Sequence, residues 1–123
     1  MADWTTEQAA QLAAPQEVQV IIGRRDGSPG RPTTIWIVGD GDRVFIRSTN
    51  GRTASWFRRG VATGAGQIIS DGRASDVAFT EVDTADLPTV DAAYRQKYGR
   101  YPSIVDHLVE TGPREATLHV HPA

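Results

Sequence analysis

The residues best suited to chemistry lie in one loop and one short helix near the middle of the chain. The loop runs from Ser48 to Gly51, and its small and polar residues leave backbone N–H groups accessible. Arg52 and Arg58 follow closely and bring guanidinium groups to the same region. Backbone amides beside guanidinium groups are suited to an anion such as phosphate. The stretch therefore predicts an anion site, with an ordinary solvated loop as the alternative.

The charge distribution also points to the central third of the chain. From Arg24 to Arg73 there are nine arginines and four aspartates, a balance of +5, whereas the rest has four basic and eleven acidic residues, a balance of −7. Lys97 is the only lysine among the thirteen basic residues. The planar guanidinium fork matches phosphate and carboxylate groups. We predict a phosphorylated or acidic small ligand; the alternative is that these arginines are solvated on strand edges and turns.

Composition excludes several classes of function. The net charge of −2 argues against a general nucleic-acid binder. The absence of cysteine excludes disulfides, thiolate metal sites and cysteine nucleophiles, and it fits a reducing compartment. No apolar run approaches the roughly 18 residues that a membrane span requires. The N-terminal sequence also lacks the basic and apolar regions of a signal peptide, so we expect a cytoplasmic protein.

The hydrophobic pattern predicts one domain over residues 1–123, mainly β with helices outside. Alternating or β-branched runs predict six strands, at residues 17–24, 33–38, 43–48, 67–70, 73–82 and 115–121. Helices are predicted at residues 5–14, 55–62, 84–98 and 103–109, and a turn at 111–113. Short turns between most strands favour a six-stranded antiparallel barrel over residues 17–122, with two helical insertions and an N-terminal helix within residues 1–15.

Several motifs in this order resemble those of the FMN-binding split β-barrel superfamily, which is related to pyridoxamine-phosphate oxidase. Within it the chain is most similar to small actinobacterial deazaflavin-dependent reductases of the nitroreductase-like type and to a neighbouring branch of uncharacterised function. The resemblance covers residues 17–122. The matching motifs are Gly23-Arg24-Arg25-Asp26-Gly27, Arg31-Pro32-Thr33-Thr34-Ile35-Trp36, Asp40-Gly41-Asp42, Ser48-Thr49-Asn50-Gly51, Trp56-Phe57-Arg58-Arg59-Gly60 and Tyr98-Gly99-Arg100-Tyr101.

The resemblance implies a split barrel that binds FMN or a deazaflavin coenzyme of the F420 type and transfers hydride to a small organic substrate. It also implies a homodimer, because such proteins usually build the flavin pocket at a two-fold interface. The cofactor would carry the hydride chemistry, so no catalytic acid, base or nucleophile is identified. The implied cofactor-binding residues are Thr33, Thr34, Trp36, Ser48, Asn50, Gly51, Arg52, Trp56 and Arg58, and the implied substrate-side residues are Tyr98 and Tyr101.

Two departures from the family pattern leave a second interpretation open. Thr49 stands where the family has a lysine in its phosphate loop, and Arg59 stands where it has an asparagine. Either a nearby arginine replaces the lost charge, or the barrel is a non-catalytic binding protein that has lost the flavin. Trp56 has a further alternative as a core anchor, since large aromatic residues dominate cores. Tyr98 and Tyr101 have one as packing residues at a helix end.

The three histidines are the candidate ligands for a metal site. His119 and His121 are two residues apart on a predicted strand and so share a face, and His107 could approach them. Three imidazoles and a carboxylate could bind a metal ion. Because the sequence offers no other ligand spacing, we predict no metal site.

Overall fold

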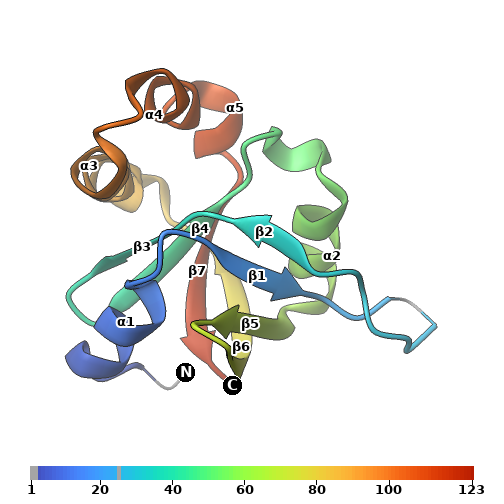
Figure 1. Ribbon diagram of the computed structural model, residues 1–123. Helices are drawn as coiled ribbons and strands as arrows, with labels where there is room; N and C mark the ends of the chain where they lie inside the picture. Colours follow the sequence, from blue (N-terminus) through green and yellow to red (C-terminus); the bar gives the residue numbers. More distant parts are fainter. Residues whose placement is uncertain (1–2, 25) are drawn as a thin grey trace.

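The computed structural model describes residues 3–24 and 26–123 (Figure 1). Three residues lie outside the described part of the chain. They are Met1 and Ala2 of the predicted N-terminus and Arg25 of the predicted arginine-rich stretch. The helices are α1 (Thr6–Ala13), α2 (Ser55–Thr63), α3 (Leu87–Tyr98), α4 (Pro102–Leu108) and α5 (Thr111–Arg114), with short 3₁₀ helices η1 (Gly51–Thr53) and η2 (Thr84–Asp86). The strands are β1 (Val18–Ile21), β2 (Thr33–Ile35), β3 (Ile37–Asp40), β4 (Arg43–Arg47), β5 (Ala65–Ser70), β6 (Arg73–Glu81) and β7 (Thr117–Pro122).

All seven strands pair antiparallel in one sheet, in the order β2-β1-β5-β6-β7-β4-β3. The two edge strands, β2 and β3, are consecutive in the chain and separated only by Trp36. The sheet therefore curls into a nearly closed barrel in which one bent segment supplies both edges. This bend explains why the structure has seven strands where the sequence predicted six, since the predicted strand 33–38 is divided at Trp36.

Side chains from the end of α3 hold this bend. The hydroxyl group of Tyr98 lies 3.2 Å from the amide nitrogen of Ile37, and the ammonium group of Lys97 donates to the carbonyl oxygen of Ile37 over 2.7 Å. The ring of Trp36 stacks on that of Tyr98, with centroids 3.9 Å apart and planes within 4°. Backbone groups that an edge strand would leave open are thus satisfied by a helix.

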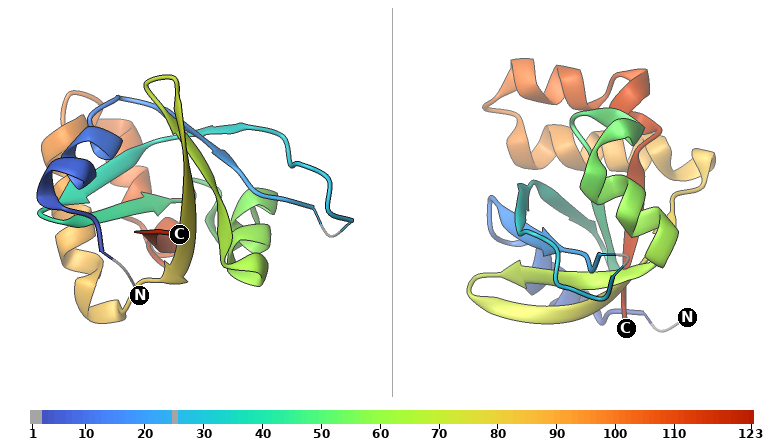
Figure 2. Two further views of the ribbon diagram at one scale, coloured as in Figure 1. Left: turned by 90° about the horizontal axis from the view of Figure 1, so that it is seen from below. Right: turned by 90° about the vertical axis from the view of Figure 1, so that its right-hand side faces the viewer.

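Two helices close the interior of the barrel. Trp56 and Phe57 of α2 and the buried face of α1 belong to the same apolar cluster as the inward-facing strand residues. Both Figure 1 and the left view of Figure 2 show α1 and α2 at opposite ends of the sheet. The start of α1 follows the predicted capping box, in which Thr5 and Gln8 exchange side-chain and backbone hydrogen bonds.

The remaining helices cover the outside of the barrel at β3 and β4. Phe45 points outward from β4 into a second apolar cluster with Val90, Tyr94 and Tyr98 of α3. The right view of Figure 2 shows α3, α4 and α5 together on one side of the sheet. Residues 111–114 form the helical turn α5 rather than the predicted open turn. Among the described residues no helix is long and apolar enough to cross a membrane.

Candidate functional site

The predicted anion loop lines an open groove of about 730 Å³. One wall is the connection between β4 and α2, and the other is formed by α4 and α5. We call it the loop groove. Its size is within the range of small-molecule sites. It is lined by Thr49, Asn50, Gly51, Thr53, Ala54, Ser55, His107, Glu110, Gly112 and Pro113.

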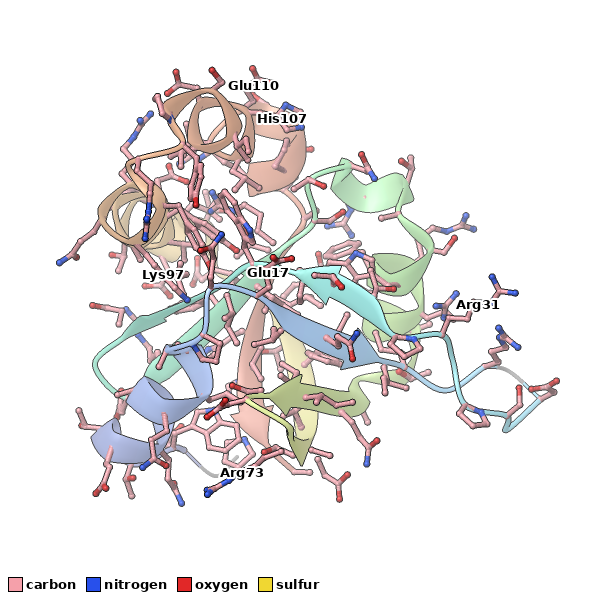
Figure 3. The ribbon with its side chains drawn as sticks, viewed as in Figure 1. Glu17, Arg31, Arg73, Lys97, His107 and Glu110 are labelled. Carbon is pink, nitrogen blue, oxygen red and sulfur yellow. The ribbon has the colours of Figure 1, made fainter. Side chains whose placement is uncertain are left out.

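His107 connects the two walls of the loop groove, and sequence reasoning did not place it there. Its Nε2 atom lies 2.7 Å from the carbonyl oxygen of Thr49, and its Nδ1 atom lies 3.2 Å from a carboxylate oxygen of Glu110. Figure 3 shows His107 of α4 close to Glu110, which lies between α4 and α5. By the resemblance to the flavin-binding proteins, Thr49 stands where that family has a lysine. The structure places the imidazole of His107 against the backbone of this residue. No local signal reveals this contact, because 58 residues separate the two partners.

The loop itself has the compact form that an anion cradle requires. Gly51 has a φ of +71°, and a β-carbon at that position would lie 3.5 Å from the carbonyl oxygen of Gly112. Because of this positive φ, a side chain there would be strained, although the β-carbon would make only an ordinary contact with α5. Ser48, by contrast, is buried and its hydroxyl group has no hydrogen-bond partner. The predicted residues Asn50 and Gly51 line the groove, while Ser48 lies behind the loop.

The two predicted arginines differ sharply in their surroundings. Arg52 pairs with Glu81, donates to the carbonyl oxygen of Glu115 over 2.8 Å, and lies over the ring of Phe57. The hydrogen bond with Glu81 raises the pKa of Arg52. Arg58 is exposed, and none of the described acidic residues pairs with it. Ser55 and Arg58 are three residues apart on α2 and share a helix face, so Arg58 lies next to a groove-lining residue, although it does not line the groove itself.

Arg31 is a further unpaired arginine, which the candidate set from sequence did not include. It is exposed in the segment that leads into β2, and no acidic partner occurs for it among the described residues. Figure 3 shows it on the side of the molecule where α2 lies. Arg31 and Thr33 are two residues apart, and in an extended segment such residues lie on the same face. This spacing could have identified Arg31 from the sequence.

The predicted ring-binding residues do not line the loop groove. Thr33 and Thr34 lie on the edge strand β2, where Thr34 is exposed and faces Gln19 of β1 across the sheet. Trp36 is half-buried between Tyr98 and Tyr101, whose ring centroids lie 3.9 and 5.7 Å from its own.

The remaining predicted aromatic residues are largely structural in their contacts. Tyr98 is buried and its hydroxyl group donates to the carbonyl oxygen of Gln16 over 2.6 Å; burial raises the pKa of Tyr98 to about 12. Trp56 is 7% exposed in the barrel core. Tyr101 is half-buried and receives a long hydrogen bond of 3.4 Å from Gln16.

A buried ionic network lies directly behind the groove. The guanidinium group of Arg47 is fully buried and donates to Asp91 over 2.7 Å, to the carbonyl oxygen of Leu108 over 3.0 Å and to the hydroxyl group of Thr117 over 2.8 Å. Asp91 also lies 2.9 Å from Nε of Arg114, although that N–H is not aligned for a hydrogen bond. Since Leu108 follows His107 on α4, this network fixes the groove wall that carries His107.

Lys97 connects backbone segments of the fold and also lines a separate open pocket between α1, β3 and α3. Its ammonium group donates to the carbonyl oxygens of Ala13, Pro15 and Ile37 over 2.6–2.7 Å. Burial lowers the pKa of Lys97 to about 8. At neutral pH the amine is therefore mostly protonated and has three N–H groups for its three acceptors.

The three histidines do not lie together as a metal site would require. The rings of His119 and His121 are adjacent on β7, with centroids 3.9 Å apart. His107 lies on α4 and contacts the carbonyl oxygen of Thr49 instead. The prediction that His107 could approach the pair is wrong, because α4 places it against the loop. Residues 3–24 and 26–123 contain no group of three or more histidine and acidic side chains arranged to hold a metal ion.

Comparisons with known proteins identify the family and the fold. A family described as an uncharacterized protein conserved in bacteria (DUF2255) matches residues 8–120. No curated protein matches the chain.

Two solved structures are similar to this one. HutZ, the heme storage protein from Vibrio cholerae, has a TM-score of 0.66 and 14% identity, covering 88% of this chain and 82% of its own. An F420 reductase has a TM-score of 0.51 and 18% identity, covering 93% and 91%. At such identities the similarity concerns the fold alone. The chain belongs to the DUF2255 family of bacterial proteins, and its fold is similar to those of HutZ and the F420 reductase.

Proposed function

We propose that this protein binds a phosphorylated flavin or deazaflavin, with the phosphate in the loop groove, and that it acts as a hydride-transferring reductase on a small organic substrate. The observation that carries the proposal is the groove itself, where Asn50 and Gly51 meet Ser55 and His107. Backbone amides, a hydroxyl group and an imidazole are suited to a phosphate. The fold similarity to an F420 reductase supports the choice of cofactor class.

Arg58 is the proposed guanidinium partner of this phosphate. It shares a helix face with Ser55, which lines the groove, and its charge is not neutralised by a described acidic residue. Arg52 was also expected to bind the cofactor, but it would first have to give up Glu81. We therefore assign Arg58 the larger contribution and Arg52 the smaller one.

The proposed position of the ring system is the edge of the sheet at β2. Because β2 pairs only with β1, its other side has backbone groups available for hydrogen bonds to the ring edge. Thr33, Thr34 and Trp36 belong to this edge and remain the proposed ring contacts. Tyr101 remains the proposed substrate-side residue, since Tyr98 and Trp56 are buried.

A second candidate is a non-catalytic barrel that binds another planar ligand, and heme is the specific alternative. HutZ is a heme storage protein with a similar fold. His119 is partly exposed, and burial lowers its pKa to about 4, so its ring is neutral at physiological pH. A neutral imidazole is a common ligand of heme iron. Loss of heme binding in His119→Phe would support this candidate.

We further propose that the protein is a homodimer formed through the outer face of β1, β5 and β6. Figure 1 looks onto β1, β2 and β5 with no helix in front of them. Gln19, Ile21, Gln67 and Ile69 lie there in register and are uncharged. Two-fold dimers are the commonest assembly. Sedimentation should give a dimer that Ile69→Arg dissociates; a monomer at micromolar wild-type protein would contradict the proposal.

The proposed cofactor is tested by titration of the purified protein with FMN, a deazaflavin coenzyme and heme in parallel. Binding is followed by the absorbance spectrum and by quenching of tryptophan fluorescence, to which Trp36 contributes. We expect saturable quenching by FMN or the deazaflavin. Saturation by heme alone would favour the non-catalytic candidate, and saturation by none of the three would contradict both.

A further inference from the structure

Among the residues that line the loop groove, His107 is the single one whose side chain can carry a positive charge. The charged groups nearest in the chain are engaged elsewhere: Asp106 pairs with Arg95 of α3. On the adjoining elements Arg52 pairs with Glu81 and Arg114 with Asp91, whereas Arg58 of α2 is exposed and does not line the groove. Within the lining of the groove, an anion therefore meets His107 as the one side chain that can carry a positive charge.

The ring of His107 has a defined orientation. A backbone carbonyl oxygen only accepts hydrogen bonds, so Nε2 must carry the proton that it shares with the carbonyl oxygen of Thr49. Nδ1 faces the carboxylate of Glu110 on another side of the ring. When the ring is protonated, both nitrogens donate, and both have an oxygen to receive them. Glu110 thus stabilises the imidazolium ion without occupying the edge that faces the loop.

We propose that His107 binds the phosphate from within the lining of the loop groove, with Glu110 as its positioning residue. Nε2–H leaves the carbonyl oxygen of Thr49 and donates to a phosphate oxygen, while Nδ1–H stays with Glu110. The side chains of Asn50 and Ser55 complete the donor set from the opposite wall. The proposed function supplies only the identity of the molecule that carries the phosphate; the phosphate site stands separately.

Phosphate binding at this site depends on pH. A protonated imidazole attracts phosphate more strongly than a neutral one, so we expect the affinity for phosphate to rise as the pH falls. The second ionisation of a phosphate monoester lies near pH 6, and protonation of the phosphate opposes the rise at lower pH. Replacing the imidazole by a permanently charged amine separates the two effects, because only the contribution of the phosphate then remains.

The test uses inorganic phosphate as the probe, so that it does not depend on flavin binding. Phosphate is titrated into the full chain at pH 6 and pH 8, and the ring nitrogen signals of His107 are followed by ¹⁵N NMR. We expect saturable movement of the Nε2 signal and tighter binding at pH 6. His107→Gln should weaken binding about tenfold or more. His107→Lys should restore it and remove the imidazole part of the pH dependence.

The control variant is His121→Gln, which replaces a histidine on β7 that does not line the groove. It should leave phosphate binding unchanged. Glu110→Gln should weaken binding at pH 6 and reduce the difference between pH 6 and pH 8. Unchanged phosphate affinity in His107→Gln, with the fold intact by circular dichroism, would overturn the proposal. If phosphate binds as expected but no flavin does, the proposed function fails while the phosphate site stands.

Discussion

The hydroxyl group of Tyr98 accepts a hydrogen bond from the amide of Ile37 and donates one to the carbonyl oxygen of Gln16, over 3.2 and 2.6 Å. One phenol thereby joins the linker before β1 to the edge strand β3, at the bend that lets a single segment supply both edges of the sheet. The stacked ring of Trp36 adds an apolar contact at the same point. The closed shape of the barrel depends on a residue of α3 that is 61 positions away from Ile37.

Removing this hydroxyl group should destabilise the whole barrel. Tyr98→Phe keeps the stacked ring but leaves the buried amide of Ile37 and the part-buried carbonyl oxygen of Gln16 with one partner fewer each. A buried group without a partner costs about 1–3 kcal/mol, so we expect a loss of that order in the free energy of unfolding. Urea denaturation measures it. Tyr101→Phe is the matched control and should change little, because that hydroxyl group receives only a 3.4 Å bond; equal effects would argue against the role of Tyr98.

The buried ionic network predicts an asymmetry between its two partners. Asp91→Asn leaves the guanidinium group of Arg47 buried without a carboxylate, which typically costs about 3–5 kcal/mol. Arg47→Met removes the buried charge itself and leaves Asp91 beside Arg114, so the loss of stability should be smaller. Urea denaturation of both variants gives the order. If Arg47→Met were the more destabilising change, the hydrogen bonds to Leu108 and Thr117 would outweigh the ion pair.

His119 predicts how stability falls in acid. Burial and, next, the neighbouring charge of His121 lower its pKa to about 4, below the usual 6.5. The unfolded chain therefore binds a proton between pH 6.5 and 4 that the folded chain does not, so the free energy of unfolding decreases as the pH falls through this window. Since the ring is about half-exposed, solvent screening limits the effect to about 1 kcal/mol.

His119→Phe tests this expectation, since it keeps an aromatic ring against Phe45 and His121. Urea denaturation between pH 7 and 4 should show a shallower loss of stability in the variant than in the wild type. Arg43, Asp3 and Asp86 also act on His119, so the difference between the two proteins measures the whole titration of His119 with these interactions included. If the free energy of unfolding fell equally with pH in both proteins, His119 would not be the cause of the loss of stability in acid.

Arg58, the unpaired arginine next to the groove, should contribute more to cofactor affinity than Arg52. Arg58→Ala should weaken the binding of FMN or deazaflavin roughly tenfold to a hundredfold, the effect of losing one charge-assisted hydrogen bond. Arg52→Ala should have a smaller effect because that guanidinium group is held by Glu81. Arg73→Ala, an exposed arginine at the distant β5–β6 turn, is the control. Equal losses in all three variants would indicate nonspecific attraction.

The parts of the fold that depend on local pattern were predictable from the sequence. The capping box of Thr5 and Gln8 and the Asp71-Gly72 turn, where both residues have positive φ, formed as expected. The bend at Trp36 was not, because a strand that alternates regularly has no local signal for a break. Its cause is Tyr98, far away in the sequence.

The candidate site was predictable to a similar degree. Asn50 and Gly51 line a groove, as a small polar loop beside a helix suggests. The different roles of Arg52 and Arg58 depend on Glu81, which is 29 residues from Arg52. The approach of His107 to Thr49 depends on how α4 packs. Such pairings between distant residues are set by tertiary packing and have no counterpart in spacing or composition.

The most direct test of the phosphate site in the proposed function compares FMN with riboflavin, which differs only by lacking the phosphate. Both are titrated into the same protein at pH 6.5, and tryptophan quenching gives the two dissociation constants. If the loop groove holds the phosphate, FMN should bind at least about tenfold more tightly than riboflavin, and His107→Gln should remove most of that difference. Equal affinities for FMN and riboflavin in the wild type would contradict the account.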